Sequence, residues 1–390
     1  MTTDRAYDVI AFGATGFTGR LVAEYLVNNY ADGSVSWAMA GRSLTKLQEI
    51  RDEIGAPADT PLITANADDP AALLALASRA DCVITTVGPY QLYGEPLLAA
   101  CVTAGTAYVD LCGEPNWMHD MIRKYDADAR TSGARIVFSC GFDSIPFDLG
   151  VWTVEQAAIA KFGKPAPRVK GRVRAMKGTF SGGTFASGKA TAAAAMKDPS
   201  VFKALVDPFA LTPGFEGPSQ PRGVLPEYDD AVSAWVAPFM MAVINTKNVH
   251  RTNFLAGHPY GEDFQYDEMM VAPGLGDLGK AAAEAIAKMN PMNAEKGPAP
   301  GEGPSKEERD TGYYDIAFVA EMPDGQRLTA TVKGDRDPGY GSTSKMIAES
   351  AICLVKDVKG EGGIWTPGAI MAEPLKKRLQ DHAGLSFEVS

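Results

Sequence analysis

The stretch YDVIAFGATGFTGR (residues 7–20) decides the fold of the N-terminal part of this chain. A short apolar run ends in three glycines spaced three residues apart, and a helix-forming stretch follows at once. This layout is typical of the strand–turn–helix unit that binds the pyrophosphate of a dinucleotide. Gly13 allows a sharp turn, Gly16 lets the backbone approach the phosphates at the helix start, and Gly19 allows close helix packing. We expect the cofactor to contact this loop at Gly13, Thr15, Gly16, Phe17, Thr18 and Gly19.

The first 140 or so residues alternate short apolar runs with helical patterns, which predicts a doubly wound parallel sheet, the Rossmann form of an α/β fold. Expected strands are 8–12, 36–40, 62–65, 82–86, 107–110 and 135–139. Expected helices between them are 44–54, 70–78, 96–104 and 117–132. The alternation stops after Pro146.

The later sequence predicts a helix at 151–162, a strand at 168–179, a hairpin at 313–332 and a helix at 344–355. Segments 208–226 and 297–308 are rich in proline and glycine and are expected to be irregular. A chain of 390 residues is long enough for two domains.

Composition excludes several classes of protein. The net charge of −11 argues against nucleic acid or an anionic membrane as the main partner. The five cysteines are scattered without a CxxC pair, so neither a disulfide framework nor a metal site is expected. No secretory leader and no membrane-spanning stretch are visible, which favours a cytoplasmic location.

The end of the second strand distinguishes NADP from NAD. NAD enzymes place an acidic residue there for the ribose 2′-hydroxyl, whereas an arginine can accommodate a 2′-phosphate. Here the strand is followed by Arg42 and Ser43, Lys46 lies one helical turn on, and the next acidic residue is Glu49. A guanidinium can pair with a phosphate through two hydrogen bonds. The sequence therefore predicts NADP as the cofactor, bound through Arg42, Ser43 and Lys46.

Two further segments follow strands at the edge where ligands bind in such sheets. After the fourth strand, we expect Val87, Gly88 and Pro89 to contact the cofactor. Tyr90 or Tyr93 could place a phenol near the nicotinamide. After the sixth strand, Asp143 and Ser144 are candidates for orienting the substrate, and Asp148 is expected to cap the helix from residue 151.

Several other enzyme signatures fail on spacing. The run from Gly183 to Ala190 resembles a phosphate-binding loop, but alanine stands where the metal-binding hydroxyl belongs. The proton donor Tyr-x-x-x-Lys of short-chain dehydrogenases is absent, because Tyr340 and Lys345 are one residue too far apart. The Gly-x-Ser-x-Gly motif of serine hydrolases is absent too. The glycine-rich segment is instead expected to bind the substrate through Ser181, Gly182, Gly183 and Thr184.

Five motifs together resemble the saccharopine dehydrogenase-like oxidoreductases, most of all the actinobacterial trans-acting enoyl reductase group. They are GATGFTG (13–19), AGRS (40–43), TVGPYQLYG (86–94), YVDLCGE (108–114) and CGFDSIPFD (140–148). DPGYG (337–341) and GIWTP (363–367) are similar too, so the resemblance covers nearly the whole chain.

The resemblance implies an NADP-binding Rossmann domain at 1–148, a mixed-sheet α/β substrate domain at 149–338, and C-terminal helices at 339–390 that return to the first domain. It also implies that NADPH reduces the α,β double bond of an enoyl thioester carried by a polyketide synthase. The enolate formed on the way would need an oxyanion donor and a proton source. Our candidates are Tyr90, Tyr93, Ser144 and the N–H groups of residues 181–184.

Two alternatives stay open. A saccharopine-type dehydrogenase of an amino-acid imine would need clustered arginines, and Arg168, Arg172 and Arg174 share one strand face. A cofactor-binding module without turnover would fit the lack of an obvious proton donor. The substrate, a homodimer and peripheral contact with a membrane are also open.

Overall fold

The computed structural model describes residues 5–179, 181–289 and 301–390, and their strands form two seven-stranded sheets. Sheet A is parallel throughout, with the order β13-β6-β5-β4-β1-β2-β3. Its strands are β1 (Tyr7–Phe12), β2 (Trp37–Gly41), β3 (Leu62–Thr64), β4 (Ala80–Thr85), β5 (Ala107–Val109), β6 (Arg135–Val137) and β13 (Gly363–Trp365). The first six confirm the expected Rossmann sheet, and β13 adds an edge strand that the sequence did not reveal.

Helices cover both faces of sheet A, which explains why its strands are apolar on both sides. The helices of this half are α1 (Phe17–Asn29), α2 (Leu44–Glu53), α3 (Pro70–Ala77), α4 (Tyr90–Tyr93), α5 (Glu95–Ala104), α6 (Pro115–Ser132) and α13 (Thr343–Lys356). Helices α3, α5 and α6 pack on one face, and α1 and α13 pack on the other.

Sheet B is mixed and has the order β14-β12-β11-β7-β10-β9-β8. Its strands are β7 (Arg168–Lys177), β8 (Glu227–Asp229), β9 (Ala234–Pro238), β10 (Gln265–Val271), β11 (Tyr313–Glu321), β12 (Arg327–Gly334) and β14 (Leu385–Val389). Among the strand pairs that the described residues form in sheet B, only β7–β10 is parallel. The strand and hairpin expected at 168–179 and 313–332 correspond to β7, β11 and β12.

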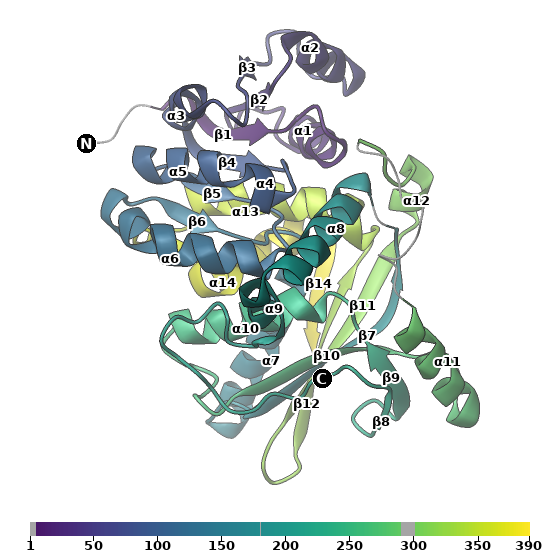
Figure 1. Cartoon of the computed structure of the whole chain (residues 1–390). Coiled ribbons are helices and arrows are strands. Elements are labelled where there is room, and N and C mark those ends of the chain that lie inside the picture. Colours follow the sequence, from purple (N-terminus) through teal and green to yellow (C-terminus); the bar gives the residue numbers. More distant parts are fainter. Residues whose placement is uncertain (1–4, 180, 290–300) are drawn as a thin grey trace.

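The remaining helices surround sheet B or connect the two sheets (Figure 1). They are α7 (Ile145–Phe162), α8 (Gly182–Lys197), α9 (Pro199–Val206), α10 (Ala242–Leu255), α11 (Gly276–Lys288), α12 (Lys306–Asp310), the π-helical turn η2 (Pro338–Ser342) and α14 (Pro367–His382).

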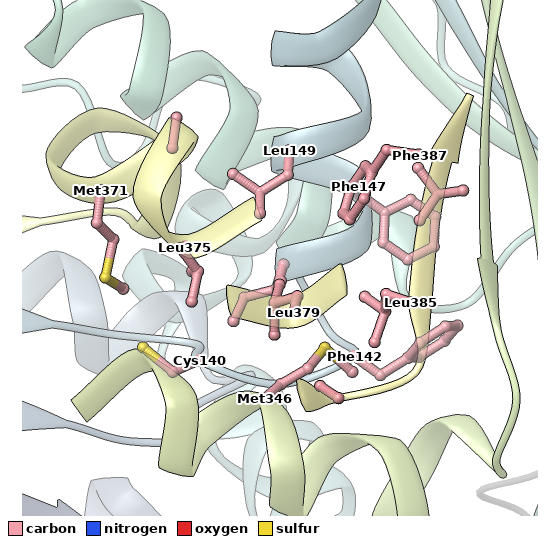
Figure 2. Packing of buried hydrophobic residues seen from close by; sticks show 14 of the residues in the cluster. Cys140, Phe142, Phe147, Leu149, Met346, Met371, Leu375, Leu379, Leu385 and Phe387 are labelled. Carbon is pink, nitrogen blue, oxygen red and sulfur yellow. The ribbon is translucent and has the colours of Figure 1, made fainter. Parts of the chain in front are cut away.

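One hydrophobic core joins the two sheets. It runs from α1 and the inner face of sheet A through α13, α14 and α7 to β11, β12 and β14. Figure 2 shows the middle of this core, where Met346 of α13 and Leu379 of α14 lie among residues of α7 and β14. The C-terminal helices thus pack between the sheets, and β14 then takes the chain into sheet B. The domain boundaries at residues 148 and 338 stay a prediction.

Two local expectations were wrong. Asp148 does not cap a helix from residue 151, because α7 already begins at Ile145, with Pro146 in its first turn. Its carboxylate instead accepts a hydrogen bond from the amide of Gly368, 2.7 Å away in the first turn of α14. Segment 297–308 is not wholly irregular: residues 297–300 lie outside the described residues, but a capping box between Ser305 and Glu308 starts α12.

Candidate active site

The glycine loop between β1 and α1 has the shape that a pyrophosphate requires. Gly13 has a φ of +93°, which favours glycine, and its amide donates to the carbonyl of Ala40, 3.0 Å away. A Cβ on Gly19 would lie 2.1 Å from the Gly13 carbonyl oxygen, so only glycine fits at this crossing. Gly16 is the N-cap of α1, and no side chain caps this helix. The helix N-terminus is therefore open to an anion, and the loop fits a dinucleotide.

The residues expected at the 2′-phosphate lie beside this loop. A Cβ on Gly41, the last residue of β2, would lie 3.5 Å from the Thr15 methyl group, so the loop reaches the end of β2. Arg42 follows directly and its side chain is exposed, as is that of Lys46. The Ser43 hydroxyl accepts a hydrogen bond from the Lys46 amide at 3.4 Å and caps α2. Arg42 and Lys46 thus offer positive charge at this edge.

The segment after β4 lies against the same loop. The amide of Thr86 donates to the carbonyl of Phe12, 3.2 Å away. A Cβ on Gly13 would lie 2.9 Å from a methyl group of Val87, and a Cβ on Gly88 would lie 3.7 Å from the Ser187 hydroxyl of α8. Residues 87 and 88 are therefore placed between the glycine loop and α8, and Pro89 begins α4 as its N-cap.

The N-terminus of α8 meets the glycine loop through a residue that the sequence analysis did not choose, Tyr340. The amide of Ser181 donates to the Tyr340 hydroxyl, which is also 2.8 Å from the Thr184 hydroxyl. The Tyr340 ring packs edge-on against Phe17, with 5.3 Å between the ring centroids. One buried phenol therefore joins Ser181 and Thr184, two expected substrate residues, to the expected cofactor loop.

Asp337 fixes the position of Tyr340. Its carboxylate accepts hydrogen bonds from the amides of Tyr340 (3.1 Å) and Gly341 (2.6 Å) and so caps η2. The signal was present in the DPGYG motif, but the spacing to Lys345 had argued against a catalytic tyrosine there. The Lys345 ammonium lies 4.0 Å from Asp335, so it interacts with another carboxylate of the chain.

Asp143 belongs to the same region. Its side chain is half-buried, and a Cβ on Gly113 would lie 3.8 Å from its carboxylate. Burial raises the pKa of Asp143 to about 6, and its negative charge acts to raise the pKa of Tyr340. A carboxyl group whose pKa is raised by burial is typical of functional sites.

The hydroxyl groups of Tyr90, Tyr93 and Ser144, which the sequence makes candidates for catalysis, have other surroundings. The buried Tyr90 hydroxyl donates to the Thr85 carbonyl (3.2 Å) and accepts from the Leu111 amide (3.1 Å). Tyr93 is half-exposed on α4. The Ser144 hydroxyl is buried and accepts a hydrogen bond from the Asn248 side chain in α10. The hydroxyl groups of Tyr90 and Ser144 thus form hydrogen bonds within the fold. The catalytic role of all three residues stays a prediction.

The arginines of β7 are all paired with carboxylates of the chain itself. Arg172 is completely buried and binds Asp229 (2.6 Å) and Asp267 (2.9 Å). Arg168 binds Asp267, and Arg174 binds Asp315 at 2.5 Å. This face of sheet B therefore has its positive charge neutralised, which removes the feature that favoured an amino-acid substrate with several carboxylates.

No group of three or more histidine, cysteine, aspartate or glutamate side chains in residues 5–179, 181–289 and 301–390 could hold a metal ion. In the same part of the chain, no helix is both long and apolar enough to cross a membrane.

Comparisons with known proteins agree with this geometry. Residues 9–137 match the saccharopine dehydrogenase NADP binding domain. Over its whole length the chain is 39% identical to a Mycobacterium tuberculosis protein assigned to the trans-acting enoyl reductases, with 98% of that protein covered. It is 33% identical to the trans-acting enoyl reductase of Mycobacterium ulcerans, over 97% of this chain and 96% of the relative.

Among solved structures, apo saccharopine dehydrogenase (L-Glu forming) from Saccharomyces cerevisiae has a TM-score of 0.54 with this chain. The match covers 98% of this chain and 99% of that one at 12% identity, so it supports a common fold alone. The two sequence comparisons go further and confirm the resemblance seen in the motifs. The chain belongs to the saccharopine dehydrogenase-like oxidoreductases, in the trans-acting enoyl reductase group, and is an NADP-dependent oxidoreductase.

Proposed function

We propose that this protein reduces the α,β double bond of an enoyl thioester with NADPH. The observation that carries the proposal is the meeting of the glycine loop with the N-terminus of α8 through Tyr340. In this arrangement two uncharged hydrogen-bond donors, the Tyr340 phenol and the Gly183 amide at the start of a 16-residue helix, lie close to the expected cofactor loop. Such donors suit a thioester oxygen that becomes negative in the transition state.

In this proposal, different residues bind the cofactor and stabilise the charge that develops on the substrate. The amides at the start of α1 bind the pyrophosphate, and Arg42 with Lys46 binds the 2′-phosphate. Bound NADPH would supply a hydride to the β-carbon of the substrate. The amide of Gly183 at the start of α8 would then stabilise the negative charge on the thioester oxygen, whereas the Thr184 amide donates to the capping hydroxyl of Ser181.

The arrangement also limits the access of water. Gly303 packs so closely on Phe17 that a Cβ there would lie 2.5 Å from the ring, and the guanidinium carbon of Arg309 lies 5.6 Å from the ring centroid. The amide of Gly182 donates to the carbonyl of Glu302, 3.2 Å away. The segment before α12 therefore covers the contact between the glycine loop and α8, which strengthens electrostatic interactions inside the site.

A carrier-bound substrate implies a partner. We propose that a polyketide synthase that lacks its own reductase domain presents the acyl chain in the cytoplasm, because the relatives are named as enoyl reductases that act in trans. A homodimer and peripheral contact with a membrane remain compatible with this proposal. If the carrier is recognised, an acyl-carrier-bound enoyl group should be reduced with a higher kcat/KM than the same group on pantetheine.

The proposed function is tested by NADPH oxidation. The purified protein is mixed with NADPH and 2-enoyl thioesters of increasing chain length, and absorbance at the nicotinamide band is followed. A product heavier by two hydrogens is expected by mass spectrometry, and the saturated thioester of each length serves as the control. If no enoyl thioester of any length supports oxidation, but an imine formed from an amino acid and a keto acid does, the saccharopine-type alternative replaces this proposal.

A further inference from the structure

Tyr340 is held more firmly than a side chain that only fills space. It is 4% exposed, its backbone is fixed by Asp337 at the start of η2, and its ring packs against Phe17. η2 leads directly into α13, the helix that packs on β1, β4 and β5 of sheet A. The phenol is therefore rigidly connected to the sheet that carries the cofactor loop.

The hydrogen bonds of the phenol define what it can do. The Ser181 amide can only donate, so it occupies one lone pair of the Tyr340 oxygen. The Thr184 hydroxyl, 2.8 Å away, can either donate to this oxygen or accept its proton, and Thr184 is half-buried. The phenol thus has one fixed donor and one partner that can exchange a proton with it.

The charged and polar groups around the Tyr340 phenol also favour a role as a proton donor. Burial raises the pKa of Tyr340, while the hydrogen bonds from Ser181 and Thr184 lower it, and Asp143 raises it. Arg309 lies against Phe17, the ring on which Tyr340 packs. A phenol that stays protonated at neutral pH, but whose anion would be met by an amide at a helix N-terminus, is suited to give up its proton during a reaction.

We propose that Tyr340 is the proton donor of the reduction and that Thr184 relays the replacement proton. This inference rests on the proposed function. Hydride addition at the β-carbon leaves an enolate on the substrate. The Tyr340 O–H bond breaks, its proton forms the new C–H bond at the α-carbon, and the phenolate is held by the Ser181 amide. Thr184 then gives its proton to the phenolate and regains one from solvent, so the net reaction consumes one hydride and one proton.

Tyr340→Phe is compared with a matched variant, Tyr314→Phe. Tyr314 is also buried, its hydroxyl lies 2.9 Å from the Ser342 hydroxyl of η2, and it belongs to β11 of sheet B. Tyr340→Phe should lower kcat for an enoyl thioester by about 10²–10⁴-fold, the range expected for loss of a general acid. Tyr314→Phe should keep kcat, and both should keep the NADPH Kd measured by nicotinamide fluorescence within about twofold.

A second readout separates proton donation from a structural role. With a 2-methyl-2-enoyl thioester the new α-carbon is chiral, so wild-type protein should give one enantiomer, because the proton arrives from one face. In Tyr340→Phe the proton comes from water, and a mixture of enantiomers is expected. Thr184→Val should slow turnover, and Thr184→Ser, which keeps a hydroxyl, should restore it.

The outcomes distinguish the two proposals. If wild-type protein reduces enoyl thioesters while Tyr340→Phe keeps kcat within about threefold and gives the same enantiomer, the inference on Tyr340 is overturned and the function stands. Loss of NADPH affinity in Tyr340→Phe with unchanged stereochemistry overturns it as well, because the residue would then only support the fold. If wild-type protein reduces no enoyl thioester, both proposals fall.

Discussion

Gly19 in α1 crosses Gly13 so closely that a Cβ on Gly19 would lie 2.1 Å from the carbonyl oxygen of Gly13. This contact holds the start of α1 against the end of β1, and the turn between them is the expected pyrophosphate site. Gly13 cannot move away easily, because its amide donates a hydrogen bond to the Ala40 carbonyl of β2.

Gly19→Ala should therefore weaken NADPH binding by at least about tenfold, or about 1.4 kcal/mol, because α1 must move away from the loop. Gly360→Ala is the matched control, since a Cβ on Gly360 meets nothing within 4 Å. Binding is measured by nicotinamide fluorescence and stability by thermal unfolding. Equal affinities of the two variants would show that the loop does not hold the pyrophosphate.

Arg42→Ala should lower the affinity for NADPH by about 10–100-fold, the usual loss for a charge-assisted hydrogen bond, and leave NADH affinity unchanged. Arg222→Ala is the control, because Arg222 is exposed and its neighbour Gly223 lies against β10 in sheet B. The two dissociation constants are compared for each variant. The 2′-phosphate assignment is wrong if Arg42→Ala weakens both dinucleotides alike.

Arg172→Met should destabilise the fold by about 3–5 kcal/mol, because the buried carboxylates of Asp229 and Asp267 each lose one of the two cations that they contact. Arg174→Met removes a cation from the same strand face, but that ion pair is partly exposed, so about 1 kcal/mol or less is expected. Urea unfolding of both variants measures the difference. A similar loss in both would mean that the burial of Arg172 does not govern its contribution.

Glu155 should make stability depend on pH. Burial raises its pKa to about 8, although its carboxylate accepts a hydrogen bond from the Ala166 amide at 2.9 Å. A raised pKa means that the stabilisation is fully present below the usual value of 4.5 and is lost as the pH rises through about 8. In Glu155→Gln the fall in melting temperature between pH 5 and pH 8 should be smaller than in wild-type protein. Parallel melting curves for the two proteins over this range would contradict the assignment.

The sequence predicted sheet A well because its signals are local. Each strand is a short apolar run before a glycine or a helix start, and the glycine spacing from Gly13 to Gly19 identifies the first turn. The sequence does not reveal strands β13 and β14, because their partners lie more than two hundred and more than fifty residues earlier in the chain. Local patterns carry no information on such pairings.

The candidate site shows the same limit. Ser181 and Thr184 were chosen for their place in a glycine-rich helix start, which is a local signal. The Tyr-x-x-x-Lys spacing of an α-helix does not identify Tyr340, because this residue lies in a π-helical turn and its hydrogen-bond partners are 159 and 156 residues away. Tyr90 looked favourable by position along the chain, but the direction of its hydroxyl depends on the backbone of β4 and residue 111.

The path of the last fifty residues has a consequence for how this protein can be divided. Helix α13 covers a face of sheet A, and β14 then pairs with β12 at the edge of sheet B. The last fifty residues therefore contact both halves of the protein. Expressed alone, residues 1–148 would leave the apolar surface beneath α13 open to water. We therefore expect that the cofactor-binding half cannot be transferred by recombination to another substrate-binding half without loss of stability. Both halves have to be present in one chain for the shared core to form.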